Sequence, residues 1–469
     1  MRKPLSTCAG GAANRFSDLL IGATFATALL LVAPGESTGQ DAHYWTLHYG
    51  PRSSLLGGAV IGSVDDVSGT YYNPGALVLA EDLAFAVSAD VFEFSVVTLD
   101  DGGGEGVDLG TARSGLRPSL IAGTIKEGLF GSGILAYSAL TRTRGEQDLQ
   151  GLVVLSGTDI PPEDNLDHFA ALARFEGRFN EFWGGLTYSH RFGSHFGLGV
   201  TWYGALRSQR RRSETVSQGV GTDGSGTAIL DIRGGKYSSL RTLFKFGAFA
   251  AVGPLTGGLT VTTPGIHITG SGQLGFDTGT FASDTAALAV TVQTDLPAEF
   301  KSPLSVGFGV GWRIGSTRLH ASGEWYDAIE PYVVMQGEDF VAQEPPEVIE
   351  VDAVQTLDEV FNWGVGLEHT FSPRLTGYLS YYLDATGLTD EVDAADAALS
   401  TTPLDLNTVT LGTDFAVSSA RLTLGVGYGW GSKVDQALTD LLRQEDPDFE
   451  ARFVYRSFRF LFGFEIGVD

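Results

Sequence analysis

The feature that most constrains this sequence is a strict alternation of bulky apolar residues with glycine, hydroxyl or charged residues. The alternation is clearest near the C-terminus, where the apolar positions are Phe458, Phe460, Phe462, Phe464 and Ile466. The residues between them include Arg459, Gly463 and Glu465. Successive side chains of a β-strand point to opposite faces of the sheet. The pattern therefore predicts strands with one greasy face and one small or polar face.

The same alternation recurs along the chain and predicts about fourteen strands. A composition of 63 Gly and 11% aromatic residues, with only 18% charged residues, also fits a large all-β protein better than a helical one. The predicted strands cover residues 83–98, 117–125, 131–143, 180–190, 195–208, 239–250, 257–269, 297–312, 317–329, 357–370, 375–384, 405–415, 420–431 and 452–467.

The predicted connections sort by length. Every second one is short: 126–130, 191–194, 251–256, 313–316, 371–374 and 416–419. The others are long: 99–116, 144–179, 209–238, 270–296, 330–356, 385–404 and 432–451. Short turns at one rim and long loops at the other are typical of outer-membrane barrels, whereas a soluble sandwich has no reason to sort its loops in this way. The sequence therefore predicts a transmembrane antiparallel β-barrel of about fourteen strands.

The N-terminus has the pattern of a secretory signal peptide, expected to span residues 1–39. Arg2 and Lys3 precede an apolar stretch from Leu19 to Ala33, which is short for a membrane-spanning helix. No later apolar run is long enough to span a membrane as a helix, so the mature chain would cross it as strands that close into a barrel. We expect residues 83–469 to form this barrel in the outer membrane of a Gram-negative cell.

Residues 40–82 do not alternate and are too apolar for a periplasmic tail, so we expect them to form a plug in the lumen. This segment carries Gly50-x-Arg52, the pair Asp65-Asp66, and the run from Tyr72 through Asn73-Pro74-Gly75 to Leu77. In these motifs the chain resembles the N-terminal hatch of the FadL/TodX family. That hatch typically carries an Asn-Pro-Ala signature, which Asn73 and Pro74 match and in which Gly75 replaces the alanine. The resemblance extends over nearly the whole mature chain and implies transport of long-chain fatty acids or other hydrophobic molecules.

The candidate hatch or gating residues are Arg52, Asp65, Asp66, Asn73, Pro74 and Gly75. Asn-Pro marks a turn, and the proline removes a backbone donor, whatever the family. The alternative to gating is that this turn only ends the plug before the first strand.

Charged residues on the predicted inner faces are the second set of candidates: Lys245, Arg318, Glu324, Glu368 and Arg459. In an open pore such charges would tune selectivity. In a plugged barrel they would hold the plug through ion pairs, which is the interpretation we prefer, with Arg52 as a partner for one glutamate.

Several classes of function are disfavoured. A formal net charge of −26 has the wrong sign for a nucleic-acid binder. No H-E-x-x-H, G-x-S-x-G or phosphate-loop motif is present, so we expect neither an enzyme nor a bound cofactor or metal. The single cysteine, Cys8, would leave with the signal peptide.

The sequence thus favours passive outer-membrane transport of hydrophobic small molecules. A non-transporting barrel that anchors or shuttles secreted proteins, and a general porin, stay open as alternatives. The expected partners are the substrate, outer-membrane lipid and lipopolysaccharide, and the barrel assembly machinery, with the protein itself a monomer. The acidic long loops are most simply solvated, although their carboxylates could also bridge to lipopolysaccharide through divalent cations.

Overall fold

The computed structural model describes residues 43–79, 85–100, 108–156, 166–282, 286–343, 346, 348–349, 352–388, 404–417, 420–435 and 451–466. All of these residues lie in one compact unit, Ser37–Asp469. The predicted signal peptide, residues 1–39, lies outside the described residues, as do most of the acidic loops. No helix in the described part of the chain is long and apolar enough to cross a membrane.

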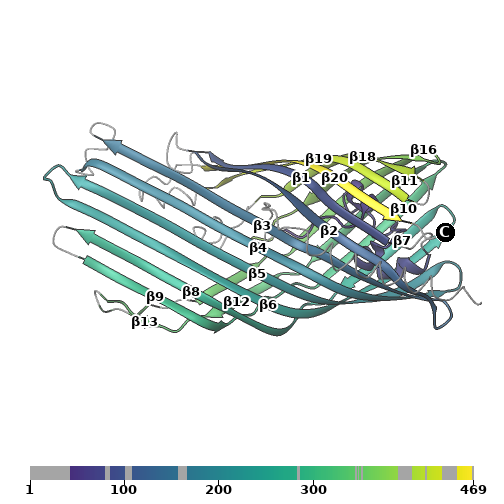
Figure 1. Ribbon diagram of the computed structural model, residues 1–469, viewed down its shortest axis with the longest axis horizontal. Coiled ribbons are helices and arrows are strands. Elements are labelled where there is room, and N and C mark those ends of the chain that lie inside the picture. The colour runs from purple at the N-terminus through teal and green to yellow at the C-terminus, as the bar shows by residue number, and fades with distance from the viewer. Residues whose placement is uncertain are drawn as a thin grey trace, which may run out of the picture. The chain divides into compact units, whose positions relative to one another are not determined.

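The described residues form an N-terminal segment, residues 43–79, followed by strands that run to residue 466 (Figure 1). We use the name hatch segment for residues 43–79, after the predicted hatch. The hatch segment contains α2 (Pro51–Leu55), α3 (Gly69–Tyr72) and the 3-10 helix η1 (Pro74–Leu79). The strands are β1 (Phe85–Asp100), β2 (Leu109–Leu129), β3 (Gly133–Ser156), β4 (Leu166–Phe192), β5 (Phe196–Gly221), β6 (Gly226–Val252), β7 (Leu255–Thr262), β8 (Ile266–Ala282), β9 (Ala286–Pro297), β10 (Ser305–Ile314), β11 (Thr317–Tyr326), β12 (Ile329–Gln336), β13 (Phe340–Val341), β14 (Val348–Ile349), β15 (Asp352–Leu357), β16 (Val360–Ser372), β17 (Leu375–Asp384), β18 (Leu406–Val417), β19 (Ala420–Asp435) and β20 (Ala451–Ile466).

Fourteen antiparallel strands close the barrel, which confirms the predicted fold class and strand number. The circuit runs from β1 to β7, then through β10, β11 and β16 to β20, and returns to β1 through the β1–β20 pair. This closure pairs Phe85 with Ile466 and Asp100 with Arg452. Closure gives every wall strand a partner on each side, as a membrane requires of a sheet that spans it.

The strands on one side of the barrel are far longer than the alternation predicted. The strands β3, β4, β5 and β6 have 24, 27, 26 and 27 residues, and they extend well beyond β10 and β11 (Figure 1). The predictions of long loops at 144–179 and 209–238 were therefore wrong. Outside the membrane both faces of a strand meet water, so the contrast between apolar and polar positions that reveals a strand disappears there.

Two wall strands are interrupted where prolines occur. The predicted strand 257–269 is divided into β7 and β8 around Pro264, and the predicted strand 297–312 begins only at Ser305, after Pro303. Proline cannot donate to a sheet ladder. The strand β6 runs unbroken along both halves, pairing with β7 near one end and with β8 near the other. The segment between β9 and β10, residues 298–304, leaves the wall and turns inward.

The outer face of the barrel is apolar and exposed. Phe460, Trp202 and Phe308 have exposed fractions of 45%, 51% and 52%, although each lies in the middle of a regular strand. Their neighbours Arg459 and Tyr203 point inward and are buried. A wide band of exposed aromatic and aliphatic side chains on a closed sheet is the surface that meets lipid.

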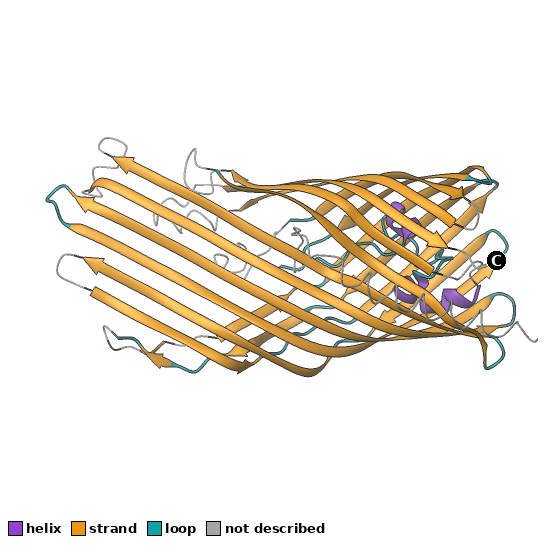
Figure 2. Ribbon diagram, in the orientation of Figure 1, coloured by secondary structure: helices purple, strands orange, loops and turns teal. Residues whose placement is uncertain are grey.

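The hatch segment is buried inside the ring of strands (Figure 2). Its apolar side chains, Leu55, Leu56 and Val60 among them, form one core cluster with inward residues of the wall such as Leu120 and Trp183. The small residues on the inner faces of the strands are therefore explained by the hatch, because they give its backbone room to approach the wall.

Candidate functional site

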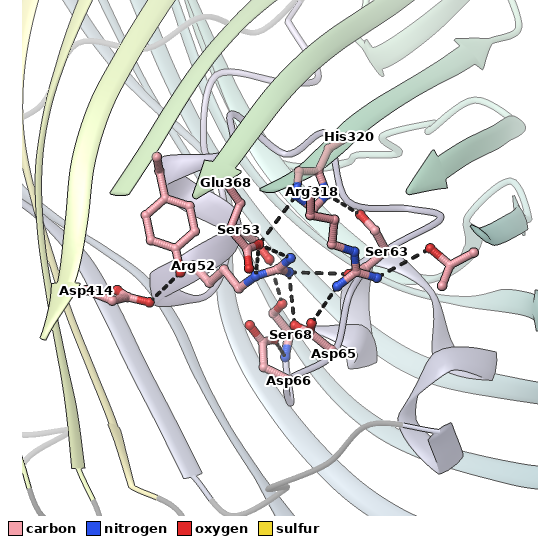
Figure 3. Close-up of polar contacts among 12 residues, drawn as sticks. Arg52, Ser53, Ser63, Asp65, Asp66, Ser68, Arg318, His320, Glu368 and Asp414 are labelled. Atoms are coloured by element: carbon pink, nitrogen blue, oxygen red, sulfur yellow. Dashed lines mark hydrogen bonds and ion pairs between the residues drawn. The ribbon is translucent and has the colours of Figure 1, made fainter. Parts of the chain in front are cut away.

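Arg52 lies at the centre of an ionic cluster between the hatch segment and the wall (Figure 3). Its Nε and Nη2 atoms both donate to Oε2 of Glu368 on β16, at 2.9 and 2.5 Å. Its Nη1 atom lies 2.9 Å from Oδ1 of Asp65. His320 on β11 places Nε2 3.4 Å from the same oxygen of Glu368 and bonds to Ser63 of the hatch through Nδ1. The cluster as a whole thus links two parts of the hatch segment to the neighbouring strands β11 and β16.

The two hatch aspartates have different surroundings. Asp65 bridges Arg52 and Arg318, whose Nη1 donates to Oδ2 at 2.8 Å, so it fastens the hatch to β11. Asp66 is buried and accepts the backbone N–H of Ser68 at 2.7 Å. Burial raises the pKa of the Asp66 carboxyl, and the neighbouring charge of Asp65 raises it further.

The Asn73-Pro74-Gly75 turn presses its backbone against the wall. Asn73 donates through Nδ2 to the carbonyls of Ile61 and Ala248, each at 3.0 Å, and accepts the N–H of Gly75 through Oδ1. A Cβ atom added to Gly75 would lie 2.7 Å from the carbonyl oxygens of Gly197 and Gly247. Only glycine fits this contact without a shift of the backbone.

The other predicted lumen charges also reach the hatch segment. Lys245 on β6 lies 3.5 Å from Glu324 on β11 and 4.7 Å above the ring of Tyr71. Glu324 accepts the indole N–H of Trp45 at 3.2 Å. Arg459 on β20 donates to the carbonyl oxygen of Thr46 at 3.0 Å. All five inner-face charges predicted from the sequence lie in networks that include hatch residues.

A pocket lies beside the hatch, next to the inward-turned segment 298–304. Its aromatic and aliphatic lining includes Tyr71, Trp183 and Leu243. The lining also carries five cationic side chains and only two carboxylates: Arg142, Arg207, Arg241, Lys245 and Lys301 against Glu181 and Glu324. An excess of positive charge in an otherwise strongly acidic chain marks this pocket as different from the rest of the molecule.

One group of residues organises the cationic side of the pocket. Glu181 on β4 pairs with Arg207 on β5 and with Arg241 on β6, and all three are almost fully buried. The ring of Phe300 lies 3.9 Å from the guanidinium carbon of Arg207 and 4.7 Å from that of Arg241. Arg241 also donates to Ser302 through Nε, but its Nη1 atom is buried with no hydrogen-bond partner in the described residues. A buried guanidinium donor without an acceptor is costly, and an anion would satisfy it.

Glu181, Arg207 and Arg241 are not among the site residues predicted from the sequence, although the alternation carries a signal for them. All three lie inside predicted strands, and each is a neighbour of an outward apolar residue such as Phe182 or Leu206, which places it on the inner face. Phe300 could not be found in this way. An unbroken strand over 297–312 would turn its side chain towards lipid, and only the break before β10 brings it inward.

The chain is similar to known proteins in its structure. No protein-family model and no curated protein sequence matches the chain. A deltaS2S3 mutant of the monoaromatic hydrocarbon channel TodX superposes with a TM-score of 0.58 and 12% identity, covering 90% of this chain and 99% of TodX. The fold is that of the FadL and TodX channels.

Two further structures, of TodX itself and of a second channel, have the same fold. The Pseudomonas putida toluene transporter TodX gives a TM-score of 0.54 at 11% identity, over 90% of this chain and 99% of its own. A FadL homologue of Pseudomonas aeruginosa gives 0.53 at 12% identity, over 93% and 100%. A closed FadL-type barrel with an exposed apolar belt belongs in the outer membrane.

Proposed function

We propose that this protein transports hydrophobic small molecules passively across the outer membrane, and that its substrates carry an anionic head group, as long-chain fatty acids do. The observation that carries the proposal is the buried, unpartnered Nη1 of Arg241 in an aromatic pocket with excess positive charge. The FadL-type fold supports the transport role, and the pocket supports the choice of substrate.

The chemistry of the pocket favours an amphipathic anion over a neutral hydrocarbon. A carboxylate placed at Arg241 would gain a charge-assisted hydrogen bond, and Arg207 and Lys301 would add favourable potential. The aromatic surfaces of Trp183 and Tyr71 would receive the first part of an acyl chain. A neutral ring such as toluene would leave the donor of Arg241 unpaired, at a cost of about 1–3 kcal/mol.

The hatch segment has a defined place in this proposal. Tyr44 and Tyr71 of the hatch line the pocket, so a substrate bound there touches the hatch directly. Passage to the periplasm would require the hatch to shift away from the wall, and its ionic cluster around Arg52 is the contact that must loosen. No energy source is needed if the substrate moves down its gradient.

Uptake of a radiolabelled long-chain fatty acid by cells that lack their own transporter tests the proposal. We expect the wild type to restore uptake and Arg241→Met to lower it about tenfold, the value of one charge-assisted hydrogen bond. Arg374→Met, which removes an exposed arginine at a periplasmic turn, is the matched control and should behave as wild type. The proposal would be contradicted if the wild type restored no uptake. It would also be contradicted if Arg241→Met took up as much fatty acid as the control Arg374→Met. Rapid entry of small hydrophilic sugars would instead favour a porin, and a stoichiometric protein partner would favour an anchor.

A further inference from the structure

The outer surface of β4, β5 and β6 changes character abruptly where these strands leave the apolar belt. On β5 the belt runs from Phe196 to Leu206, close to the 9–11 residues that a tilted strand needs to cross a membrane. The next two outward residues are Ser208 and Arg210, both exposed. Since Phe196 lies at a periplasmic turn, Ser208 and Arg210 lie at the level of the outer-leaflet head groups.

The strand register aligns the same change on the neighbouring strands. The last apolar row pairs Phe182, Leu206 and Leu240 across β4, β5 and β6. The following outward row pairs Asn180, Ser208 and Ser238. The row after that pairs Arg178, Arg210 and Lys236. We call the row of Arg178, Arg210 and Lys236 the cationic row.

The three cations of this row are directly opposite one another. Adjacent strands lie about 4.8 Å apart, so their Cα atoms span only about 10 Å along the sheet. Like charges opposite each other on a sheet destabilise it. Arg178 pairs with Glu146 of β3, whereas Arg210 and Lys236 have no ion-pair partner within the described residues. The next two outward rows differ, because their cations pair with carboxylates between the rows: Arg212 with Glu214, and Arg174 with Glu176.

We propose that the cationic row binds the phosphate groups of a lipid A-type glycolipid, the lipid portion of lipopolysaccharide, in the outer leaflet. Guanidinium and ammonium groups at this depth match phosphates in charge and position. The hydroxyl and amide groups of Ser208, Ser238 and Asn180 lie between the cations and the belt, where they can bond to the sugar and phosphate oxygens. The acyl chains would then lie along Leu206 and its neighbours.

This site is separate from the pocket inside the barrel. Arg207 and Arg241, which face inward, belong to the pocket, whereas Arg210 and Lys236 face outward on the same two strands. Replacement of the three cations should therefore leave the substrate pocket intact. Lipid binding at the cationic row does not depend on which substrate the pocket takes.

The test is lipid retention by the full mature protein in nanodiscs that contain lipid A, measured by native mass spectrometry. We expect the wild type to retain bisphosphorylated lipid A at least about tenfold better than the triple variant Arg178→Gln, Arg210→Gln and Lys236→Gln. The matched control replaces three exposed arginines at the periplasmic turns, Arg191, Arg313 and Arg374, with glutamine and should retain lipid A as the wild type does.

Two further arms identify the ligand without relying on the variants. Dephosphorylated lipid A should be retained by the wild type as weakly as by the triple variant. Millimolar inorganic phosphate should not displace lipid A, because it lacks the acyl chains. Equal retention of both forms of lipid A, equal loss in the control variant, or full displacement by inorganic phosphate would overturn the proposal.

Discussion

Arg52 of the hatch segment donates two hydrogen bonds to a single oxygen of Glu368 in the barrel wall, at 2.9 and 2.5 Å. Their side chains are only 6% and 17% exposed, so the pair is shielded from water and salt (Figure 3). The two residues are 316 positions apart in the chain, and their contact ties the first folded segment to the late strand β16. The behaviour of the hatch should depend on this pair more than on any surface charge.

The Arg52–Glu368 contact should hold the hatch in place. Replacement of Arg52 by Met leaves the largely buried carboxylate of Glu368 without its closest cation, and removing one partner of a buried pair costs about 3–5 kcal/mol. Hydrogen exchange of hatch peptides over 51–79 should then accelerate about a hundredfold or more. Exchange in β16 and β20 should change little.

An exposed ion pair provides the control for Arg52→Met. Arg174 pairs with Asp148 and Glu176 on the outer surface, where its side chain is 43% exposed. Arg174→Met should leave hatch exchange unaltered, because water and salt screen an exposed ion pair. Equal protection of the hatch in wild type and Arg52→Met would show that the pair does not anchor it.

Gly199 on the inner face of β5 should be intolerant of any side chain. A Cβ atom there would lie 2.4 Å from the carbonyl oxygen of Pro74, so Gly199→Val must displace the Asn73-Pro74-Gly75 turn. Overpacking of this kind costs about 1–3 kcal/mol. Gly204→Val, on the same strand with nothing within 4 Å of the added Cβ, should be neutral. Thermal unfolding measured by the loss of heat-modifiable gel mobility compares the two, and similar midpoints would contradict the close hatch–wall contact.

The stability of the hatch should fall as pH rises, through Asp66. Burial raises the pKa of this carboxyl in the folded protein, so the protonated form is favoured there. Its contribution is fully present below the unfolded value, about 3.9, and is lost as pH rises through the higher folded pKa. The variant Asp66→Asn keeps an acceptor for the Ser68 N–H but cannot ionise. The difference in melting midpoint between pH 5 and pH 8 should therefore be smaller in Asp66→Asn than in the wild type, and an unchanged difference would exclude Asp66 as its source.

The sequence predicted the barrel because lipid enforces a simple rule. Wall strands must present mostly apolar side chains outward at every second position, as Phe460 and Trp202 do. The strand number and the inner-face position of the charges that contact the hatch, Glu368 and Arg318 among them, follow from the same alternation.

The sequence could not predict the features that lie outside the lipid-facing belt or that depend on the strand register. Beyond the apolar belt the long strands β3 to β6 carry polar residues on their outer face, so Arg210 gives no hydropathy signal that distinguishes strand from loop. The inward turn of Phe300 depends on a break in the ladder and on two arginines from other strands. The identity of the partner of Arg52 required the register of β11 and β16, which only the folded sheet provides.

Equilibrium binding to the purified protein in nanodiscs tests the central claim most directly. The account predicts that a long-chain fatty acid binds about tenfold or more tightly than its methyl ester, because only the free carboxylate can satisfy Arg241. It also predicts that this preference disappears in Arg241→Met. Equal affinity for acid and ester in the wild type, or a preference that persists in the variant, would contradict it.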